Sequence, residues 1–106
     1  MENQVKEKIE KLLNDNQVVL FMKGTPNFPQ CGFSAQTVMV LRHAGVKDEE
    51  MAYFDVLSDP EIRQGIKEFT NWPTIHQVFV KGEFVGGCDV LNEMYQKGEL
   101  QTLLKN

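Results

Sequence analysis

The sequence has few cysteines, no long apolar run and no surplus of positive charge, and each absence excludes a class of protein. Only two of the 106 residues are cysteines, whereas a small secreted domain held by disulfides usually carries more. The longest apolar run, Val18–Met22, is far too short to cross a bilayer. The formal net charge is −4, so no basic surface for nucleic acid is expected. We therefore predict no membrane span and no nucleic-acid partner.

The residues that are present fit one small globular domain. A chain of 106 residues has the usual size of a single hydrophobic core. Its 42% apolar and 25% charged residues are ordinary for a soluble protein. The polar start MENQVKEK lacks the basic and apolar regions of a signal peptide. We expect a single domain over residues 1–106 and a cytoplasmic location.

Hydrophobic periodicity predicts the helices and strands. Apolar residues at the spacing of one helix face predict a helix over residues 3–14: Val5, Ile9, Leu12 and Leu13. Residues 18–22 form a continuous apolar run, as in a strand covered on both faces. Further signals predict helices from Cys31 to Gly45, after the cap sequence 58–61 and from residue 88, with a break at Gly98. They also predict strands over 51–56, 75–80 and 84–85.

This order of elements, αβαβαββα with a short final helix, predicts an α/β fold. The middle β–α–β unit needs a right-handed crossover, which makes its two strands parallel. The last two strands form a hairpin and are therefore antiparallel. A mixed four-stranded sheet flanked by helices satisfies both conditions.

Cys31 is the strongest candidate for chemistry, because it lies at the first turn of the second predicted helix. The unpaired amides and the dipole of a helix N-terminus favour an anion, so the thiolate is stabilised there. Lys23, at the end of the preceding strand, lies at the same end of the sheet and adds positive charge. We predict that Cys31 is reactive. We interpret Cys88 as a small packed residue whose backbone contributes to the site, and not as a second redox thiol.

Four segments resemble the signature segments of one family, in its order and spacing. They are FMKGTP at 21–26, CGFS at 31–34, WPTI at 72–75 and GGCD at 86–89. The chain resembles the monothiol CGFS glutaredoxins over essentially its whole length. This resemblance implies a thioredoxin fold, a glutathione-binding groove and a [2Fe–2S] cluster with Cys31 as its protein ligand.

The resemblance also implies roles for individual residues in the groove. Lys23 would pair with the glycine carboxylate of glutathione, with Arg63 near the same end. Thr74 and Ile75 would present backbone groups to the cysteinyl unit, and Cys88 and Asp89 would hold the γ-glutamyl end. Phe33 and Trp72 complete the expected binding set. Plainer interpretations remain open: solvated charges for Lys23 and Arg63, a core position for Trp72 and a helix cap for Asp89.

The residue at position 34 bears on how the reactive thiol is used. A dithiol oxidoreductase resolves its mixed disulfide with a second cysteine, and Ser34 occupies that position here. A [2Fe–2S] cluster needs four soft ligands, and two chains with two glutathiones supply them. The resemblance implies such a cluster-bridged homodimer, which would pass clusters to iron–sulfur recipient proteins, with at most weak oxidoreductase activity. The alternatives are a glutathione-dependent deglutathionylating enzyme, and an interaction module that docks a BolA-like protein.

His76 departs from the family pattern. The family usually has a cis-proline at this position, facing the reactive cysteine. A cis bond before a residue other than proline costs about 3–4 kcal/mol, so we expect a trans bond between Ile75 and His76. Two interpretations of His76 are open: a tolerated substitution with its side chain turned aside, or a base or metal ligand facing Cys31.

Overall fold

The computed structural model describes residues 2–105 and contains five α-helices and six strands within them. The helices are α1 (Asn3–Asp15), α2 (Gly32–His43), α3 (Pro60–Thr70), α4 (Cys88–Gln96) and α5 (Glu99–Leu104). The strands of the main sheet are β1 (Val18–Met22), β4 (Met51–Asp55), β5 (Gln77–Val80) and β6 (Glu83–Gly86). A short hairpin, β2 (Gly24–Thr25) and β3 (Phe28–Pro29), and a 3₁₀ turn, η1 (Asp48–Glu50), complete the chain.

The main sheet is mixed, with strand order β4-β1-β5-β6. Strand β1 pairs in parallel with β4, through the crossover that contains α2. It pairs antiparallel with β5 on its other side, and β5 forms the predicted hairpin with β6. The mixed four-stranded sheet predicted from the sequence is therefore confirmed.

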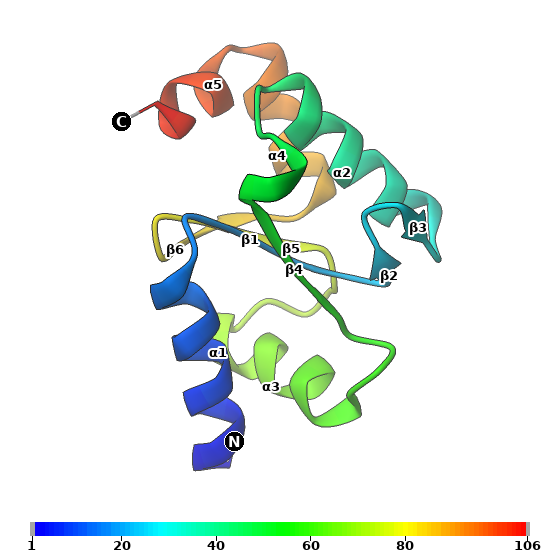
Figure 1. Cartoon of the computed structure of the whole chain (residues 1–106), viewed down its shortest axis with the longest axis vertical. Helices are drawn as coiled ribbons and strands as arrows, with labels where there is room; N and C mark the ends of the chain where they lie inside the picture. Colours follow the sequence, from blue (N-terminus) through cyan, green and yellow to red (C-terminus); the bar gives the residue numbers. More distant parts are fainter. Residues whose placement is uncertain (1, 106) are drawn as a thin grey trace.

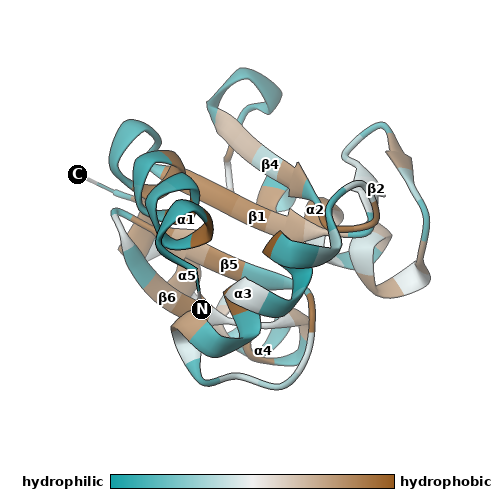
Figure 2. Ribbon diagram, turned by 90° about the horizontal axis from the view of Figure 1, so that it is seen from below, coloured by the Kyte–Doolittle hydropathy of each residue, from teal (hydrophilic) through white to brown (hydrophobic). Residues whose placement is uncertain are grey.

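The helices cover both faces of the sheet. Helices α1 and α3 pack together on one face, and α2, α4 and α5 lie on the other (Figure 1). Seen from below, α1 and α3 turn a hydrophilic surface outward over the hydrophobic strands β1 and β5 (Figure 2). This is the three-layer arrangement of the thioredoxin fold.

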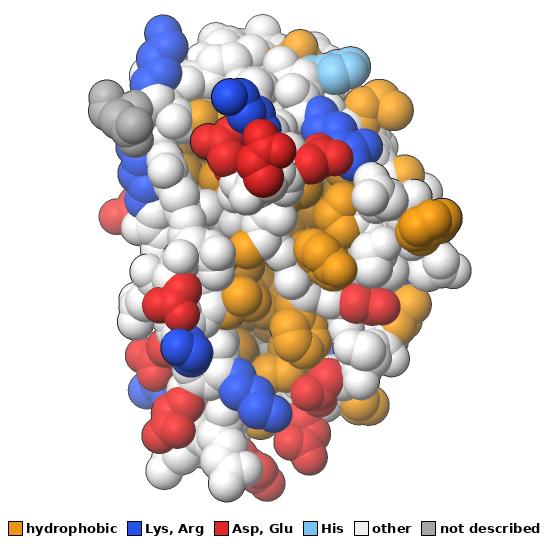
Figure 3. Space-filling model, in the orientation of Figure 1, with side chains coloured by type: hydrophobic (Ala, Val, Ile, Leu, Met, Phe, Trp, Pro, Cys, Tyr) orange, Lys and Arg blue, Asp and Glu red, His pale blue; other side chains and the backbone are white. Residues whose placement is uncertain are grey.

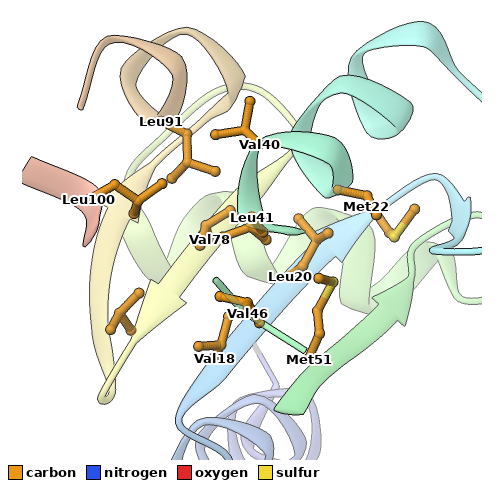
Figure 4. Close-up of a cluster of buried hydrophobic side chains, with 12 residues drawn as sticks. Val18, Leu20, Met22, Val40, Leu41, Val46, Met51, Val78, Leu91 and Leu100 are labelled. Atoms are coloured by element: carbon orange, nitrogen blue, oxygen red, sulfur yellow. The ribbon is translucent and has the colours of Figure 1, made fainter. Parts of the chain in front are cut away.

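Strand β1 supplies side chains to two hydrophobic clusters, because successive side chains of a strand point to opposite faces. Val18, Leu20 and Met22 join the cluster beneath α2, α4 and α5, shown in Figure 4. Val19 and Phe21 join the cluster beneath α1 and α3. All five residues of β1 are buried, which confirms the prediction of a strand covered on both faces.

Three local features differ from the sequence prediction. The hairpin β2–β3 lies in the segment predicted as a loop, and it requires Gly24, whose φ is +87° and whose added Cβ would lie 2.5 Å from the Phe28 carbonyl oxygen. The turn η1 precedes β4. Strand β5 begins two residues later than predicted, because His76 adopts a left-handed backbone with φ 71°.

The surface carries several large exposed hydrophobic residues: Phe28, Phe33, Met39, Tyr53, Leu57 and Trp72. Figure 3 shows hydrophobic side chains gathered across the face on which β4 forms the edge of the sheet. Within residues 2–105, no helix combines the length and apolar character needed to span a membrane.

Candidate functional site

Cys31 is the N-cap of α2, with extended backbone angles of φ −159° and ψ 143°. Its side chain is partly exposed, and both Cys31 and Cys88 are free thiols. The backbone amides of Phe33 and Ser34 lower the pKa of the Cys31 thiol below its ordinary value, and the charge of Lys23 lowers it further, although no cap hydrogen bond to the Cys31 side chain is formed. The amides at the helix start therefore favour the thiolate, as predicted.

Ser34 lies three residues after the thiol and is completely buried. Its Oγ accepts a hydrogen bond from the backbone N–H of Lys23 at 3.0 Å. The same Oγ lies 2.6 Å from Nε2 of His76. A serine hydroxyl can accept two hydrogen bonds and donate one, so it can serve the Lys23 amide and the imidazole together. The hydroxyl therefore joins the end of β1, the first turn of α2 and the segment before β5.

His76 takes the position that the family gives to proline, with a different backbone. No cis peptide occurs within residues 2–105, so the expected trans bond before His76 is confirmed. The side chain is buried, its ring centroid lies 6.2 Å from that of Phe33, and its Nε2 contacts Ser34 rather than Cys31. Burial lowers the pKa of His76 below 6.5, the charge of Lys23 lowers it further, and a hydrogen bond to the Ile75 backbone opposes both effects. The imidazole is therefore neutral at neutral pH.

A cleft beside this cluster is formed by three segments distant in sequence: the first turn of α2, the segment between α3 and β5, and the start of α4. Its lining residues are Phe33, Trp72, Thr74, Ile75, His76, Gly87, Cys88, Asp89 and Val90. Thr74 is exposed, and Trp72 is 36% exposed with its ring 5.6 Å from that of Phe84. Backbone groups, an aromatic face and a carboxylate thus surround one cleft, which suits a peptide-like ligand.

The structure brings most of the predicted binding residues together. Six of them line the cleft: Phe33, Trp72, Thr74, Ile75, Cys88 and Asp89. Lys23 does not line it, although its charge acts on both Cys31 and His76. Arg63, in the first turn of α3, is also outside the lining.

The comparisons with known proteins agree with this geometry. The family model named Glutaredoxin matches residues 18–85, which is more than half of the chain. The chain belongs to the glutaredoxin family. It is 53% identical to an uncharacterised monothiol glutaredoxin, ycf64-like, of Synechocystis over 99% of this chain and 95% of that protein.

Other relatives place it among the monothiol glutaredoxins. The mitochondrial monothiol glutaredoxin-5 of Saccharomyces cerevisiae is 50% identical, over 99% of this chain and 70% of that protein. Glutaredoxin 4 of Escherichia coli is also 50% identical, over 93% and 84%. The solution structure of reduced apo GrxS14 from poplar superposes with a TM-score of 0.80 at 43% identity, covering 92% of this chain and 87% of that one.

Asp89 lies at the start of α4 but does not cap it. The N-cap of α4 is Gly87, and no side chain makes a cap hydrogen bond there. Asp89 is the second residue of the helix and lines the cleft. The prediction that Asp89 caps the helix is therefore wrong, because the chain turns into α4 two residues earlier. Its carboxylate has no hydrogen-bond or salt-bridge partner among residues 2–105.

Gly87 and Val90 were missed as lining residues of the cleft. A Cβ at Gly87 would lie 3.0 Å from the carbonyl oxygen of His76, so glycine lets the start of α4 approach the segment before β5. The pair Gly86-Gly87 was the available signal, because adjacent glycines indicate a close approach of backbone. Val90 offered no comparable signal, since an apolar residue in a helix normally indicates the core.

Proposed function

We propose that this monothiol glutaredoxin binds glutathione in the cleft and, together with it, holds and transfers a [2Fe–2S] cluster. The observation that carries the proposal is the pairing of one accessible thiol of lowered pKa with a buried serine. Cys31 is a ready thiolate ligand, and Ser34 is fixed by two hydrogen bonds where a dithiol enzyme has its resolving cysteine.

The cleft offers groups that match the ends of glutathione. The amides at the start of α4 favour the α-carboxylate of the γ-glutamyl unit, and the free carboxylate of Asp89 favours its ammonium group. Thr74 and Ile75 supply backbone along the wall of the cleft for the cysteinyl unit. Lys23, whose charge already acts on Cys31, provides a cation for the glycine carboxylate.

One chain supplies only part of the ligand set of a cluster. A [2Fe–2S] cluster takes four thiolate-type ligands, and Cys31 is one. Cys88 is buried at the start of α4, and residues 2–105 contain no group of three or more potential metal ligands. Two chains and two glutathiones complete the set. Phe28 and Phe33, three residues before and two residues after Cys31 in the sequence, are exposed and offer apolar surface to the second chain.

The same site supports a second function in thiol exchange. The Cys31 thiolate attacks the glutathione sulfur of a glutathionylated substrate, forms a new disulfide with it and releases the substrate as a thiolate. Because Ser34 cannot resolve the mixed disulfide, a second glutathione thiolate must attack its glutathionyl sulfur, which yields oxidised glutathione and frees Cys31. The lowered pKa of Cys31 favours this candidate.

Anaerobic reconstitution with iron, sulfide and glutathione, followed by visible absorption and size-exclusion chromatography, tests the proposal. We expect a coloured dimer that reverts to a colourless monomer when the cluster is lost, and no coloured species from Cys31→Ser. A colourless monomer from the native chain would leave thiol exchange as the function. Cluster transfer is then tested by adding an apo iron–sulfur protein and following the cluster's spectrum on the recipient.

A further inference from the structure

The segment between α3 and β5, whose backbone forms one wall of the cleft, is hydrogen-bonded to one buried side-chain amide, that of Gln77. Gln77 is the first residue of β5 and pairs with Phe21 of the central strand β1. Its side chain is completely buried. From this fixed position it points toward the segment between α3 and β5 rather than into either hydrophobic cluster.

All the polar atoms of the Gln77 side chain are engaged. Nε2 donates to the carbonyl oxygen of Thr74 at 3.0 Å and to that of Trp72 at 3.4 Å. Oε1 lies 2.8 Å from the hydroxyl of Thr70, at the end of α3; this hydroxyl also lies 3.0 Å from the Ile66 carbonyl oxygen, and the two acceptors share its one proton. Two carbonyl acceptors require an N–H donor opposite them, so the orientation of the amide is fixed by its partners.

These bonds hold two carbonyls in the middle of the segment. Its ends have other contacts: the Trp72 amide bonds the Lys67 carbonyl, and His76 contacts Ser34. Trp72, Pro73 and Thr74 are exposed, and His76 is held in a left-handed conformation that a non-glycine residue adopts only at a cost. The same segment supplies Trp72, Thr74 and Ile75 to the cleft. Because the Gln77 amide bonds two carbonyls of this segment, it fixes the position of the cleft wall that the segment forms.

We propose that Gln77 is a positioning residue for glutathione binding, acting through the carbonyls of Trp72 and Thr74 with Thr70 as its anchor. The inference rests on the proposed binding of glutathione and adds a residue that does not touch the ligand. Gln77 keeps this segment in its binding conformation before glutathione arrives. No binding free energy is then lost in ordering the segment.

The test compares two disulfides that use the same thiol. The Cys31 thiolate attacks oxidised glutathione, a new disulfide forms, and one glutathione leaves as a thiolate. With bis(2-hydroxyethyl) disulfide the exchange is the same, but the tripeptide is absent. The two equilibrium constants are measured by mass spectrometry, and their ratio reports recognition of glutathione apart from the reactivity of the thiol.

Gln77→Leu and the similarly long Gln77→Met both remove the N–H donors. We expect the ratio to fall about tenfold, which corresponds to about 1.4 kcal/mol, with the constant for the hydroxyethyl disulfide unchanged. Gln101→Leu is the matched control, because Gln101 also donates its amide to a backbone carbonyl, that of Tyr95, but lies on α5. It should leave the ratio unchanged.

The possible results distinguish a failure of the positioning role of Gln77 from a failure of the proposed glutathione binding. If the native chain shows no preference for glutathione, glutathione binding fails and the role of Gln77 with it. If the native chain prefers glutathione and the Gln77 variants keep that preference within twofold, only the positioning role is overturned. Should both Gln77 variants fail to fold, as judged by circular dichroism, Thr70→Val decides: a two- to threefold loss supports the role, and an unchanged ratio overturns it.

Discussion

The imidazole of His76 and the hydroxyl of Ser34 meet at 2.6 Å, and both side chains are buried. The two residues are 42 positions apart in sequence. Their contact ties the segment before β5 to α2, the helix that Cys31 precedes as N-cap. The bond before His76 is trans, and the His76 backbone is left-handed with φ 71°.

Replacing Ser34 by alanine tests the strength of this tie. Ser34→Ala leaves the amide of Lys23 and Nε2 of His76 without their partner in a buried position. We expect the free energy of unfolding to fall by about 1–3 kcal/mol, measured by chemical denaturation. Ser58→Ala is the control, because its hydroxyl bonds the Asp55 carbonyl at an exposed site, and it should cost less than about 0.5 kcal/mol. Equal losses in the two variants would contradict the assignment.

Stability should depend on pH through His76. Its pKa is lowered in the folded chain, so between that value and about 6.5 the unfolded chain binds a proton that the folded chain does not. The contribution of His76 is fully present above pH 6.5, and the free energy of unfolding falls as the pH decreases through 6.5 toward the folded value. His76→Asn tolerates the left-handed backbone and cannot titrate. Its unfolding free energy should vary less between pH 5 and 7.5, and parallel profiles would refute the prediction.

Lys23 should tune the reactivity of Cys31. The amides of Phe33 and Ser34 make the largest contributions to its lowered pKa, and the charge of Lys23 makes a smaller one. Lys23→Met should therefore raise the midpoint of thiolate formation, while the midpoint stays below that of a free cysteine thiol. The rate of alkylation by iodoacetamide as a function of pH gives this midpoint. Lys8→Met removes an exposed charge from α1 and should have no effect. An unmoved midpoint in Lys23→Met would exclude its role.

Two aspartates near helix starts should differ in their effect on stability. Asp59 caps α3, and its Oδ1 accepts from the amides of Glu61 and Ile62, so Asp59→Ala should cost about 1 kcal/mol. Asp89 makes no cap hydrogen bond. Asp89→Asn should cost no more than about 0.5 kcal/mol but weaken the mixed disulfide with glutathione. If Asp89→Asn destabilises the fold as strongly as Asp59→Ala, Asp89 has a structural role instead.

The sequence predicts the fold well because each main element has a local signature. The apolar run of β1 and the Asp59–Pro60 start of α3 reappear as predicted. The hairpin β2–β3 was not predicted, since two-residue strands contain too few positions for an alternating pattern. Strand β5 was predicted two residues too long, because nothing local indicates that His76 adopts a positive φ.

The reactive thiol was predicted from its place at a helix start, and the cleft only from the family resemblance. The cleft contains six of the residues expected from the resemblance. The contact of His76 with Ser34 and the bonds of Gln77 depend on segments that meet only in the folded chain. Neither contact leaves a periodicity or a spacing in the sequence, so each required the three-dimensional structure.

The most direct test of the central claim is the composition of the reconstituted protein with and without glutathione. We predict that the coloured dimer contains about two irons, two sulfides and two glutathiones, and that omitting glutathione prevents its formation. Iron and sulfide are measured chemically, and glutathione by mass after acid release. A cluster that assembles without glutathione, or that forms equally on Cys31→Ser, would contradict the account.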